Sequence, residues 1–123
     1  KGSLVLDIGS NDGTCLSYVK KHGMNVIGIE PAKKPCEIAK NKGIENRNNF
    51  FSKEVAIKIK KKYGQLDFIT SHNVLAHIED IDDVFKSAFY LLKQNGYLCF
   101  EVGYFLKDLE NNYFDTIYNE HID

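Results

Sequence analysis

The hydrophobic residues of the chain alternate between short continuous runs and longer stretches in which they recur every three or four positions. A short apolar run bounded by glycine or polar residues is typical of a strand buried on both faces of a parallel sheet. This pattern predicts five strands, over Leu4–Ile8, Asn25–Ile29, Ile44–Asn48, Leu66–Ser71 and Tyr97–Val102.

The stretches between these runs predict four helices, over Thr14–His22, Lys33–Lys42, Ser52–Tyr63 and Ile81–Lys93. The last has the clearest apolar face, and four acids lie at its N-terminal end, where the helix dipole favours negative charge: Glu79, Asp80, Asp82 and Asp83. Each helix is followed by a glycine suited to a C-terminal stop, at Gly23, Gly43, Gly64 and Gly96.

Five strands that alternate with four helices predict an α/β fold with a doubly wound, mainly parallel, Rossmann-like sheet. A chain of 123 residues is about one domain. It starts at Lys1 directly before a core strand and stops at Asp123 without a closing element, so we expect a fragment of a longer protein.

Charge and composition limit the kinds of molecule that the chain is expected to bind. The net charge of −1 argues against a nucleic-acid binder, whose affinity would come from clustered Lys and Arg. Neither a signal peptide nor an apolar stretch of membrane-spanning length is present, so we expect a cytoplasmic protein without a membrane partner. The isolated Cys15, Cys36 and Cys99 lack metal-site spacing, so we expect no bound metal. The pattern carries no signal for an oligomeric state.

The turn after the first strand predicts a cofactor site, because a strand, a glycine turn and a helix N-terminus form the usual cofactor cradle of an open α/β sheet. A dinucleotide-binding turn would read GxGxxG. Here Asn11 stands at the second glycine position, and Asp12 adds a negative charge that would repel a pyrophosphate. The acids favour instead a sulfonium ligand with an amino-acid end and ribose hydroxyls.

The spacing Asp-x-Gly-x-x-x-Gly, formed by Asp7, Gly9 and Gly13, resembles that of Rossmann-like S-adenosylmethionine-dependent methyltransferases, and the resemblance covers nearly the whole chain. It implies S-adenosylmethionine as the cofactor and the strand order 3-2-1-4-5, with the chain ending before the last two strands of the family's sheet. Ser10 and Asn11 complete the cofactor-binding turn. A nicotinamide-dependent oxidoreductase is the least favoured alternative.

The resemblance also places the other parts of the cofactor. The ribose falls on Glu30, followed by Pro31, because an ionised carboxylate accepts hydrogen bonds from both ribose hydroxyls. The adenine amino group falls near Asn49 and Phe50.

Polar residues follow the fourth strand, where side chains face the ligand crevice of such sheets. We expect His72 and Asn73 to line the pocket near the reacting methyl group. His77 fits a pocket position and a packing position equally well.

The segment Phe114 to His121 resembles the Phe-Asp-Thr-Ile-Tyr-His-Glu-His signature of sugar C-methyltransferases at seven of eight positions, with Asn119 in place of the first histidine. That family methylates a carbon of nucleotide-linked keto-deoxysugars. The resemblance implies His121 as the general base, with Tyr118 and Glu120 as its partners. We therefore divide the chain into a cofactor domain, residues 1–103, and the start of a substrate and catalytic segment, residues 104–123.

The expected chemistry agrees with these residue types. A carbon acceptor must lose a proton beside a carbonyl to form an enolate, which suits a histidine base, and a tyrosine hydroxyl can donate to the developing oxyanion. Two alternatives stay open: an O- or N-methyltransferase of a small molecule, and a non-catalytic scaffold that keeps the cofactor fold.

Overall fold

The structure is a computed structural model, and it describes residues 2–103, apart from the side chain of Ala76. The expected substrate segment, 104–123, lies outside the described residues. In chain order the elements are β1 (Leu4–Ile8), α1 (Thr14–Lys21), β2 (Asn25–Ile29), α2 (Lys33–Asn41), β3 (Glu45–Arg47), α3 (Lys53–Tyr63), β4 (Leu66–His72), the 3-10 turn η1 (Leu75–His77), α4 (Ile81–Leu91) and β5 (Leu92–Glu101).

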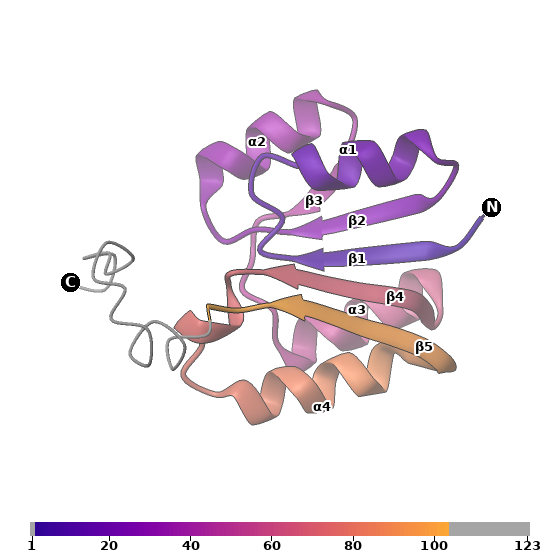
Figure 1. Cartoon of the computed structure of the whole chain (residues 1–123), viewed down its shortest axis with the longest axis vertical. Coiled ribbons are helices and arrows are strands. Elements are labelled where there is room, and N and C mark those ends of the chain that lie inside the picture. The colour runs from indigo at the N-terminus through magenta and orange to yellow at the C-terminus, as the bar shows by residue number, and fades with distance from the viewer. Residues whose placement is uncertain (1, 104–123) are drawn as a thin grey trace, which may run out of the picture.

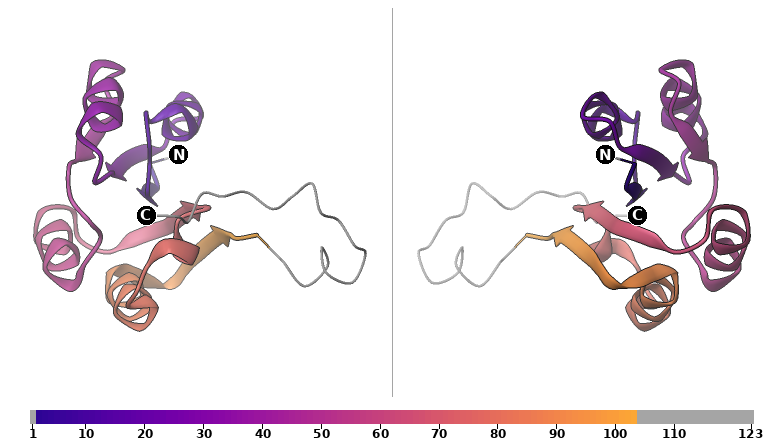
Figure 2. Two further views of the ribbon diagram at one scale, coloured as in Figure 1. Left: turned by 90° about the vertical axis from the view of Figure 1, so that its left-hand side faces the viewer. Right: turned by 90° about the vertical axis from the view of Figure 1, so that its right-hand side faces the viewer.

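The strands form one sheet in the order β3-β2-β1-β4-β5, and every neighbouring pair is parallel. Helices α1 and α2 lie over one face, and α3 and α4 lie over the other (Figure 1 and Figure 2). The predicted doubly wound fold and its strand order are therefore confirmed.

The core sits on both faces of the central strands, which explains why their sequences are almost wholly apolar. Leu6 of β1 pairs with Ile27 of β2 and with Ile69 of β4, and all three side chains are at most 1% exposed. Burying a leucine or isoleucine side chain stabilises a fold by about 1.5–3 kcal/mol. The larger apolar cluster lies under α3 and α4, and a smaller one lies under α1 and α2.

The predicted boundary between α4 and β5 is wrong. The helix ends at Leu91 and the strand begins at the next residue, so Gly96 lies within β5 and does not stop a helix. Leu66 pairs with Leu92 but Phe68 pairs with Tyr97, so the register shifts between the two strands. A Cβ atom on Gly96 would lie 3.1 Å from the carbonyl oxygen of Leu66, which shows that glycine serves close backbone approach here.

Smaller differences affect the other strands. The third strand is shorter than expected, at Glu45–Arg47, and the fourth is one residue longer, ending at His72.

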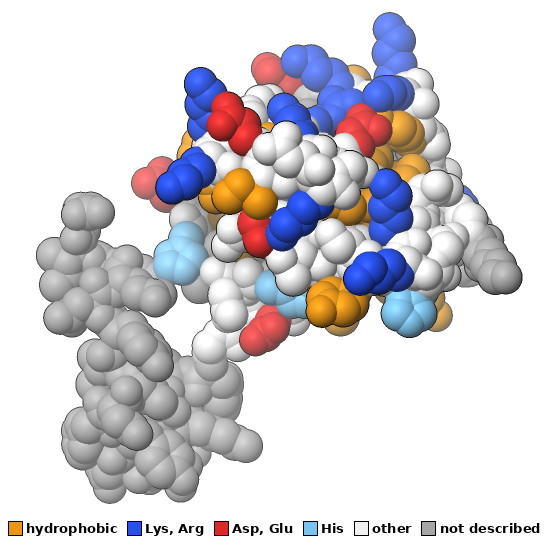
Figure 3. All heavy atoms as spheres, turned by 90° about the horizontal axis from the view of Figure 1, so that it is seen from above, with side chains coloured by type: hydrophobic (Ala, Val, Ile, Leu, Met, Phe, Trp, Pro, Cys, Tyr) orange, Lys and Arg blue, Asp and Glu red, His pale blue; other side chains and the backbone are white. Residues whose placement is uncertain are grey.

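No helix in the described residues is both long enough and apolar enough to cross a membrane. Acidic side chains lie among the lysines on the face that α1 and α2 cover (Figure 3).

Candidate cofactor site

Two neighbouring hollows lie where β1, β2 and β4 end, at the carboxyl edge of the sheet, and both are lined by Gly9. The first, called here the polar pocket, has a volume of about 340 Å³ and is lined by Asp7, Gly9, Ser10, Asn11, Asp12, Thr14, Cys15, His72 and Glu101. The second, the apolar pocket, has a volume of about 550 Å³ and is lined by Ile8, Gly9, Ile29, Pro31, Asn49, Phe50, Phe51, Val74, His77, Ile78 and Glu79.

The turn between β1 and α1 is held tightly against the end of β2. The backbone N–H groups of Gly9 and Ser10 both donate to the carbonyl oxygen of Ile29, at 2.8 and 3.0 Å. Gly9 has a φ of 74°, and a Cβ atom added to it would overlap the side chain of Val74. The turn therefore requires glycine at this position, and its two hydrogen bonds fix it to the last residue of β2.

Two further residues of the turn, Ser10 and Gly13, make hydrogen bonds within the protein. The Ser10 hydroxyl, almost fully buried, accepts a hydrogen bond from Nδ2 of Asn46 at 3.0 Å. Gly13 donates its N–H to the carbonyl oxygen of Ser10, and a Cβ atom there would lie 2.9 Å from that of Ala39. These contacts set the path of the turn into α1.

The carboxylate of Glu30 is fixed by backbone groups from two directions. Its Oε2 accepts the N–H of Asn11 at 2.9 Å, and its Oε1 accepts the N–H of Ala32 at 2.8 Å. Glu30 is 9% exposed. Glu30 lies outside the lining of both pockets, and each of its carboxylate oxygens has a second acceptor site.

Asp7 places a buried carboxylate in the lining of the polar pocket. It is 2% exposed, and its Oδ1 accepts a hydrogen bond from the Thr70 hydroxyl at 2.8 Å. Burial raises the pKa of Asp7, the Thr70 hydrogen bond and the proximity of His72 lower it, and the nearby Glu30 raises it; the net pKa shift is upward. Burial without a charged partner disfavours the ionised form, so this carboxylate would be stabilised by a cationic group in the pocket.

The raised pKa of Asp7 gives a prediction for Asp7→Asn. A carboxyl whose folded-state pKa exceeds its unfolded value contributes stability that is complete below the unfolded pKa and is lost as the pH rises through the folded pKa. Asparagine cannot ionise, and its Oδ1 still accepts from Thr70. We expect Asp7→Asn to have a higher Tm than wild type at pH 7, with the difference shrinking as the pH falls toward 4.

Thermal unfolding followed by circular dichroism across this pH range checks the result. Thr70→Val is the matched variant, because it removes the hydroxyl that stabilises the ionised Asp7 and should lower the Tm at pH 7. A lower Tm for Asp7→Asn at pH 7 would show that ionisation of Asp7 does not oppose folding.

The charge of Asp12, which the sequence suggested would face a ligand alone, is paired with a lysine. Its carboxylate forms an ion pair with Nζ of Lys42 at 2.7 Å and accepts the N–H of Thr14 at 3.1 Å. The hydrogen bond from Lys42, followed by those from Thr14, lowers the pKa of Asp12 to about 2. The positive charge of Lys42 lies beside this carboxylate, so the repulsion of a pyrophosphate expected from Asp12 is weakened. The departure from a dinucleotide turn rests on Asn11, which has a φ of 49°.

The two residues expected after the fourth strand have different positions. His72 is the last residue of β4 and lines the polar pocket. Its Nδ1 lies 3.4 Å from Oε2 of Glu101, and its Nε2 lies 3.9 Å from Sγ of Cys15. Asn73 has a φ of 54°, donates its N–H to the carbonyl oxygen of Glu101, and lies outside the lining of both pockets.

Asn49 and Phe50, expected near the adenine, and Pro31, expected beside the ribose acid, all line the apolar pocket. Pro31 lines it from the end of β2, and Asn49 and Phe50 line it from the segment after β3. Phe50 is 78% exposed, so its ring has a face open to a ligand. His77, for which the sequence left two positions open, lines this pocket as well.

Four residues of the polar pocket and its surroundings were not expected from the sequence: Thr14, which begins α1, and Cys15, Thr70 and Glu101. The contacts of the last three are long-range. These three residues come from α1, β4 and β5, and they meet His72 or Asp7 through the sheet register and the position of α1. The alternation along β4, which puts Thr70 and His72 on the same face, was a usable signal for Thr70.

His121, Tyr118 and Glu120, the expected catalytic residues, lie outside the described residues. Within residues 2–103, no group of three His, Cys, Asp or Glu side chains is arranged to hold a metal ion.

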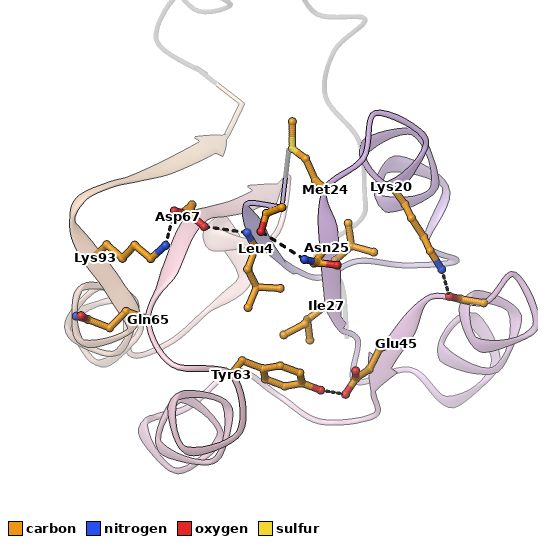
Figure 4. A pocket seen from close by; sticks show the side chains of 13 residues that line it. Leu4, Lys20, Met24, Asn25, Ile27, Glu45, Tyr63, Gln65, Asp67 and Lys93 are labelled. Carbon is orange, nitrogen blue, oxygen red and sulfur yellow. Dashed lines mark hydrogen bonds and ion pairs between the residues drawn. The ribbon is translucent and has the colours of Figure 1, made fainter.

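A third hollow, of about 590 Å³, lies at the opposite, amino edge of the sheet (Figure 4). Its charged groups bind one another or the backbone. Nζ of Lys93 lies 2.7 Å from Oδ1 of Asp67, Lys20 donates to the carbonyl oxygen of Gly43, and the Tyr63 hydroxyl donates to Glu45. The carboxylates of this hollow, Asp67 and Glu45, are thus both paired with a lysine or tyrosine side chain.

The sheet order and the crevice at its carboxyl edge agree with comparisons to known proteins. Residues 1–123 match the family described as methyltransferase domain, and the chain belongs to that family. The predicted membership of a methyltransferase family is thereby confirmed.

Two curated relatives show how far the likeness extends. The chain is 35% identical over 120 residues to the C-methyltransferase NovU of Streptomyces niveus, covering 98% of this chain and 29% of NovU. It is 31% identical over 96 residues to a ubiquinone biosynthesis O-methyltransferase of Pelagibacter ubique, covering 78% of this chain and 40% of the relative. The chain thus spans less than half the length of either relative.

Solved structures agree with the fold. A putative S-adenosylmethionine-dependent methyltransferase from Listeria monocytogenes matches with a TM-score of 0.70 and 24% identity, covering 83% of this chain and 46% of that one. The plantazolicin methyltransferase BpumL, solved in complex with a desmethylplantazolicin analogue and S-adenosylhomocysteine (SAH), matches with a TM-score of 0.71 and 14% identity, covering 96% of this chain and 45% of that one.

Proposed function

We propose that this chain is the cofactor-binding part of an enzyme that methylates a carbon of a nucleotide-linked keto-deoxysugar. The observation that carries the cofactor assignment is the pair of oriented, largely buried carboxylates, Asp7 and Glu30, beside two pockets that share Gly9. The acceptor class is supported by the likeness to NovU, which is named a C-methyltransferase, and by the segment from Phe114 to His121.

The three parts of S-adenosylmethionine fit three parts of the site. The apolar pocket, with Pro31 and the open ring of Phe50, suits the adenine. The carboxylate of Glu30, held by two N–H groups, suits the two ribose hydroxyls. The buried carboxylate of Asp7 in the polar pocket suits the cationic amino-acid end. When bound, the cofactor supplies an electrophilic methyl group on a positively charged sulfur.

In this proposal the chain contributes position and proton handling. Glu30 and Asp7 orient the ligand at the carboxyl edge, and positioning supplies much of the rate of a transfer between two bound reactants. His121 removes a proton from the carbon beside the carbonyl, and Tyr118 donates to the oxygen on which charge develops, with Glu120 beside them. The last three roles are predictions from the resemblance.

An O-methyltransferase of a small molecule is the second candidate, favoured by the likeness to a relative named an O-methyltransferase. Solvent exchange separates the two, since only a C-methyltransferase must remove a proton from carbon. Deuterium uptake from D₂O into a nucleotide-linked keto-deoxysugar, catalysed by the complete protein without cofactor, supports C-methylation. Methylation of a phenol or hydroxyl without such exchange supports O-methylation.

The cofactor assignment is tested by ligand-dependent thermal unfolding of the chain. SAH should raise the Tm, because a ligand at 100 times its Kd stabilises the folded state by about 2.7 kcal/mol. NAD at the same concentration should leave the Tm unchanged. A shift with NAD and none with SAH would refute the assignment.

A further inference from the structure

The charged side chains that line the polar pocket are mostly negative. Three of the lining residues are acids, namely Asp7, Asp12 and Glu101, and none of the described lining residues is a lysine or an arginine. The proposed placement puts the ribose on Glu30 and the amino-acid end at Asp7, so the sulfur that joins these two parts lies at this pocket. S-adenosylmethionine and SAH differ only in the methyl group on that sulfur, which is positive in the cofactor and neutral in the product. The lining can therefore distinguish the two molecules by charge.

The charge of Asp12 is balanced within the turn. Nζ of Lys42 lies 2.7 Å from Oδ2 of Asp12 and 3.0 Å from the hydroxyl oxygen of Thr14. Two opposite charges this close together largely cancel at longer range, because each acts on a distant ion with nearly the same strength and the opposite sign. Asp12 therefore adds little to the attraction of the pocket for a cation.

Glu101 has no lysine or arginine partner among the described residues. It is the last residue of β5 and the direct register partner of His72 on β4, so the two side chains lie on the same face of the sheet. Its Oε2 lies 3.4 Å from Nδ1 of His72. A neutral histidine leaves the negative charge of Glu101 uncompensated in the lining of the pocket.

We infer that Glu101 is a specificity-determining residue of the cofactor site, where its carboxylate favours the positively charged S-adenosylmethionine over the neutral SAH. The inference rests on the proposed cofactor site and does not depend on which molecule accepts the methyl group. When the methyl group is transferred, the electron pair of the broken sulfur–carbon bond stays on the sulfur, which becomes neutral. The product thereby loses its attraction to Glu101, which favours the exchange of SAH for a new molecule of cofactor.

His72 makes this preference depend on pH. Histidine is the side chain that gains a positive charge as the pH falls from 8 to 5. A protonated His72 pairs with Glu101 and adds a positive charge to the lining, so the preference for S-adenosylmethionine decreases. The titratable groups that face His72 are Glu101 on β5, Asp7 on β1 and Cys15 on α1. Burial raises the pKa of Asp7, so protonation of Asp7 acts in the same direction.

The first test compares the two ligands by calorimetry of the chain, without a methyl acceptor, at pH 7.5 and low salt. The measured quantity is the ratio of the Kd of SAH to the Kd of S-adenosylmethionine. The Glu101 side chain is 64% exposed, so Glu101→Gln should lower this ratio by about two- to fivefold, the effect of one charge pair at an exposed site. The loss should come from weaker binding of S-adenosylmethionine, with the Kd of SAH unchanged.

Glu54→Gln is the matched control for Glu101→Gln. Glu54 is an exposed acid of α3, on the other face of the sheet, so its substitution removes the same charge away from the site. The control should leave the ratio unchanged. An unchanged ratio for Glu101→Gln, or an equal weakening of both ligands by it, overturns the inference.

The second test changes the charge of the lining in the opposite direction. Lys42→Gln removes the cation beside Asp12 and leaves that negative charge unpaired, so the ratio should rise by about two- to fivefold. Lys40→Gln, which removes an exposed lysine of α2, should leave the ratio unchanged. A ratio that does not rise with Lys42→Gln shows that charge does not set the preference, and it overturns the inference.

The third test follows the same ratio with pH. Between pH 7.5 and pH 6 the ratio should fall for the wild type. His72→Gln should reduce this fall, because only the part due to Asp7 then remains. An equal fall in both proteins overturns the role of His72.

Failure of the proposed function has a different signature. If the wild-type chain binds neither S-adenosylmethionine nor SAH, the cofactor assignment fails. If it binds both and the ratio does not respond to Glu101→Gln, only the inference fails. If the ratio responds but the complete protein exchanges no deuterium into a nucleotide-linked keto-deoxysugar, C-methylation of that class fails and the inference stands.

Discussion

Glu30→Ala is expected to abolish the thermal stabilisation that SAH gives. In the structure the carboxylate is oriented by the N–H groups of Asn11 and Ala32. Each of its oxygens has a second acceptor site, which the proposed function assigns to a ribose hydroxyl. A hydrogen bond to a charged group contributes about 1.5–3 kcal/mol, so losing two of them costs about 3 kcal/mol or more. That corresponds to a loss of affinity of about 100-fold or more, measurable by calorimetry.

Glu45→Ala is the matched control for this experiment. Glu45 begins β3 at the amino edge of the sheet, where it pairs with Lys62, so its loss leaves the carboxyl edge intact. The control should bind SAH with wild-type affinity. Equal weakening by both substitutions would point to a general loss of structure, and unchanged binding by Glu30→Ala would exclude Glu30 from the ribose contact.

Gly9→Ala is expected to destabilise the chain by about 2–5 kcal/mol, from two sources. A residue with a side chain in the left-handed region costs about 1–2 kcal/mol, and Gly9 has a φ of 74°. Inserting an atom into a packed site costs about 1–3 kcal/mol more, and here the new Cβ would overlap Val74. Urea unfolding followed by circular dichroism measures the change.

Gly43→Ala separates the two sources. Gly43 has the same φ of 74°, but the nearest atom to a Cβ atom there would be Nζ of Lys20 at 3.8 Å, an ordinary contact, so only the backbone cost applies. Adding Val74→Ala to Gly9→Ala should recover part of the loss, because it removes the overlapping methyl groups. If Gly9→Ala cost no more than Gly43→Ala, the close packing of Val74 on the turn would be ruled out as a constraint.

Much of the fold could be predicted because each element has a local signal. The first two strands have the predicted bounds, since Leu4–Ile8 and Asn25–Ile29 are apolar runs with clear polar ends. The junction of α4 and β5 could not be predicted. Its position depends on the pairing of β5 with β4, and the close approach of Gly96 to Leu66 becomes apparent only in the assembled sheet.

For the site, the sequence predicted which strand ends carry polar residues but not which side chains contact one another. Residues at strand ends, such as Asp7 and His72, could be placed at the crevice because all carboxyl ends of a parallel sheet meet at one edge. Pairings between residues far apart in the sequence could not be predicted. The ion pair of Asp12 with Lys42 and the contact of His72 with Glu101 each join residues about thirty positions apart, and they depend on helix position and strand register.

The contact between Glu30 and the N–H of Asn11 has a consequence for engineering the cofactor preference. The acid that is proposed to recognise the ribose also holds the turn that faces the rest of the ligand. Substitutions at these two positions should therefore show strong epistasis, since residues in one hydrogen-bond network are not additive. A library that seeks a new cofactor must vary both positions together. A change at Glu30 removes the proposed ribose acceptor and also leaves the N–H of Asn11 without this partner, and the residue at position 11 must then keep a φ of 49° without that contact.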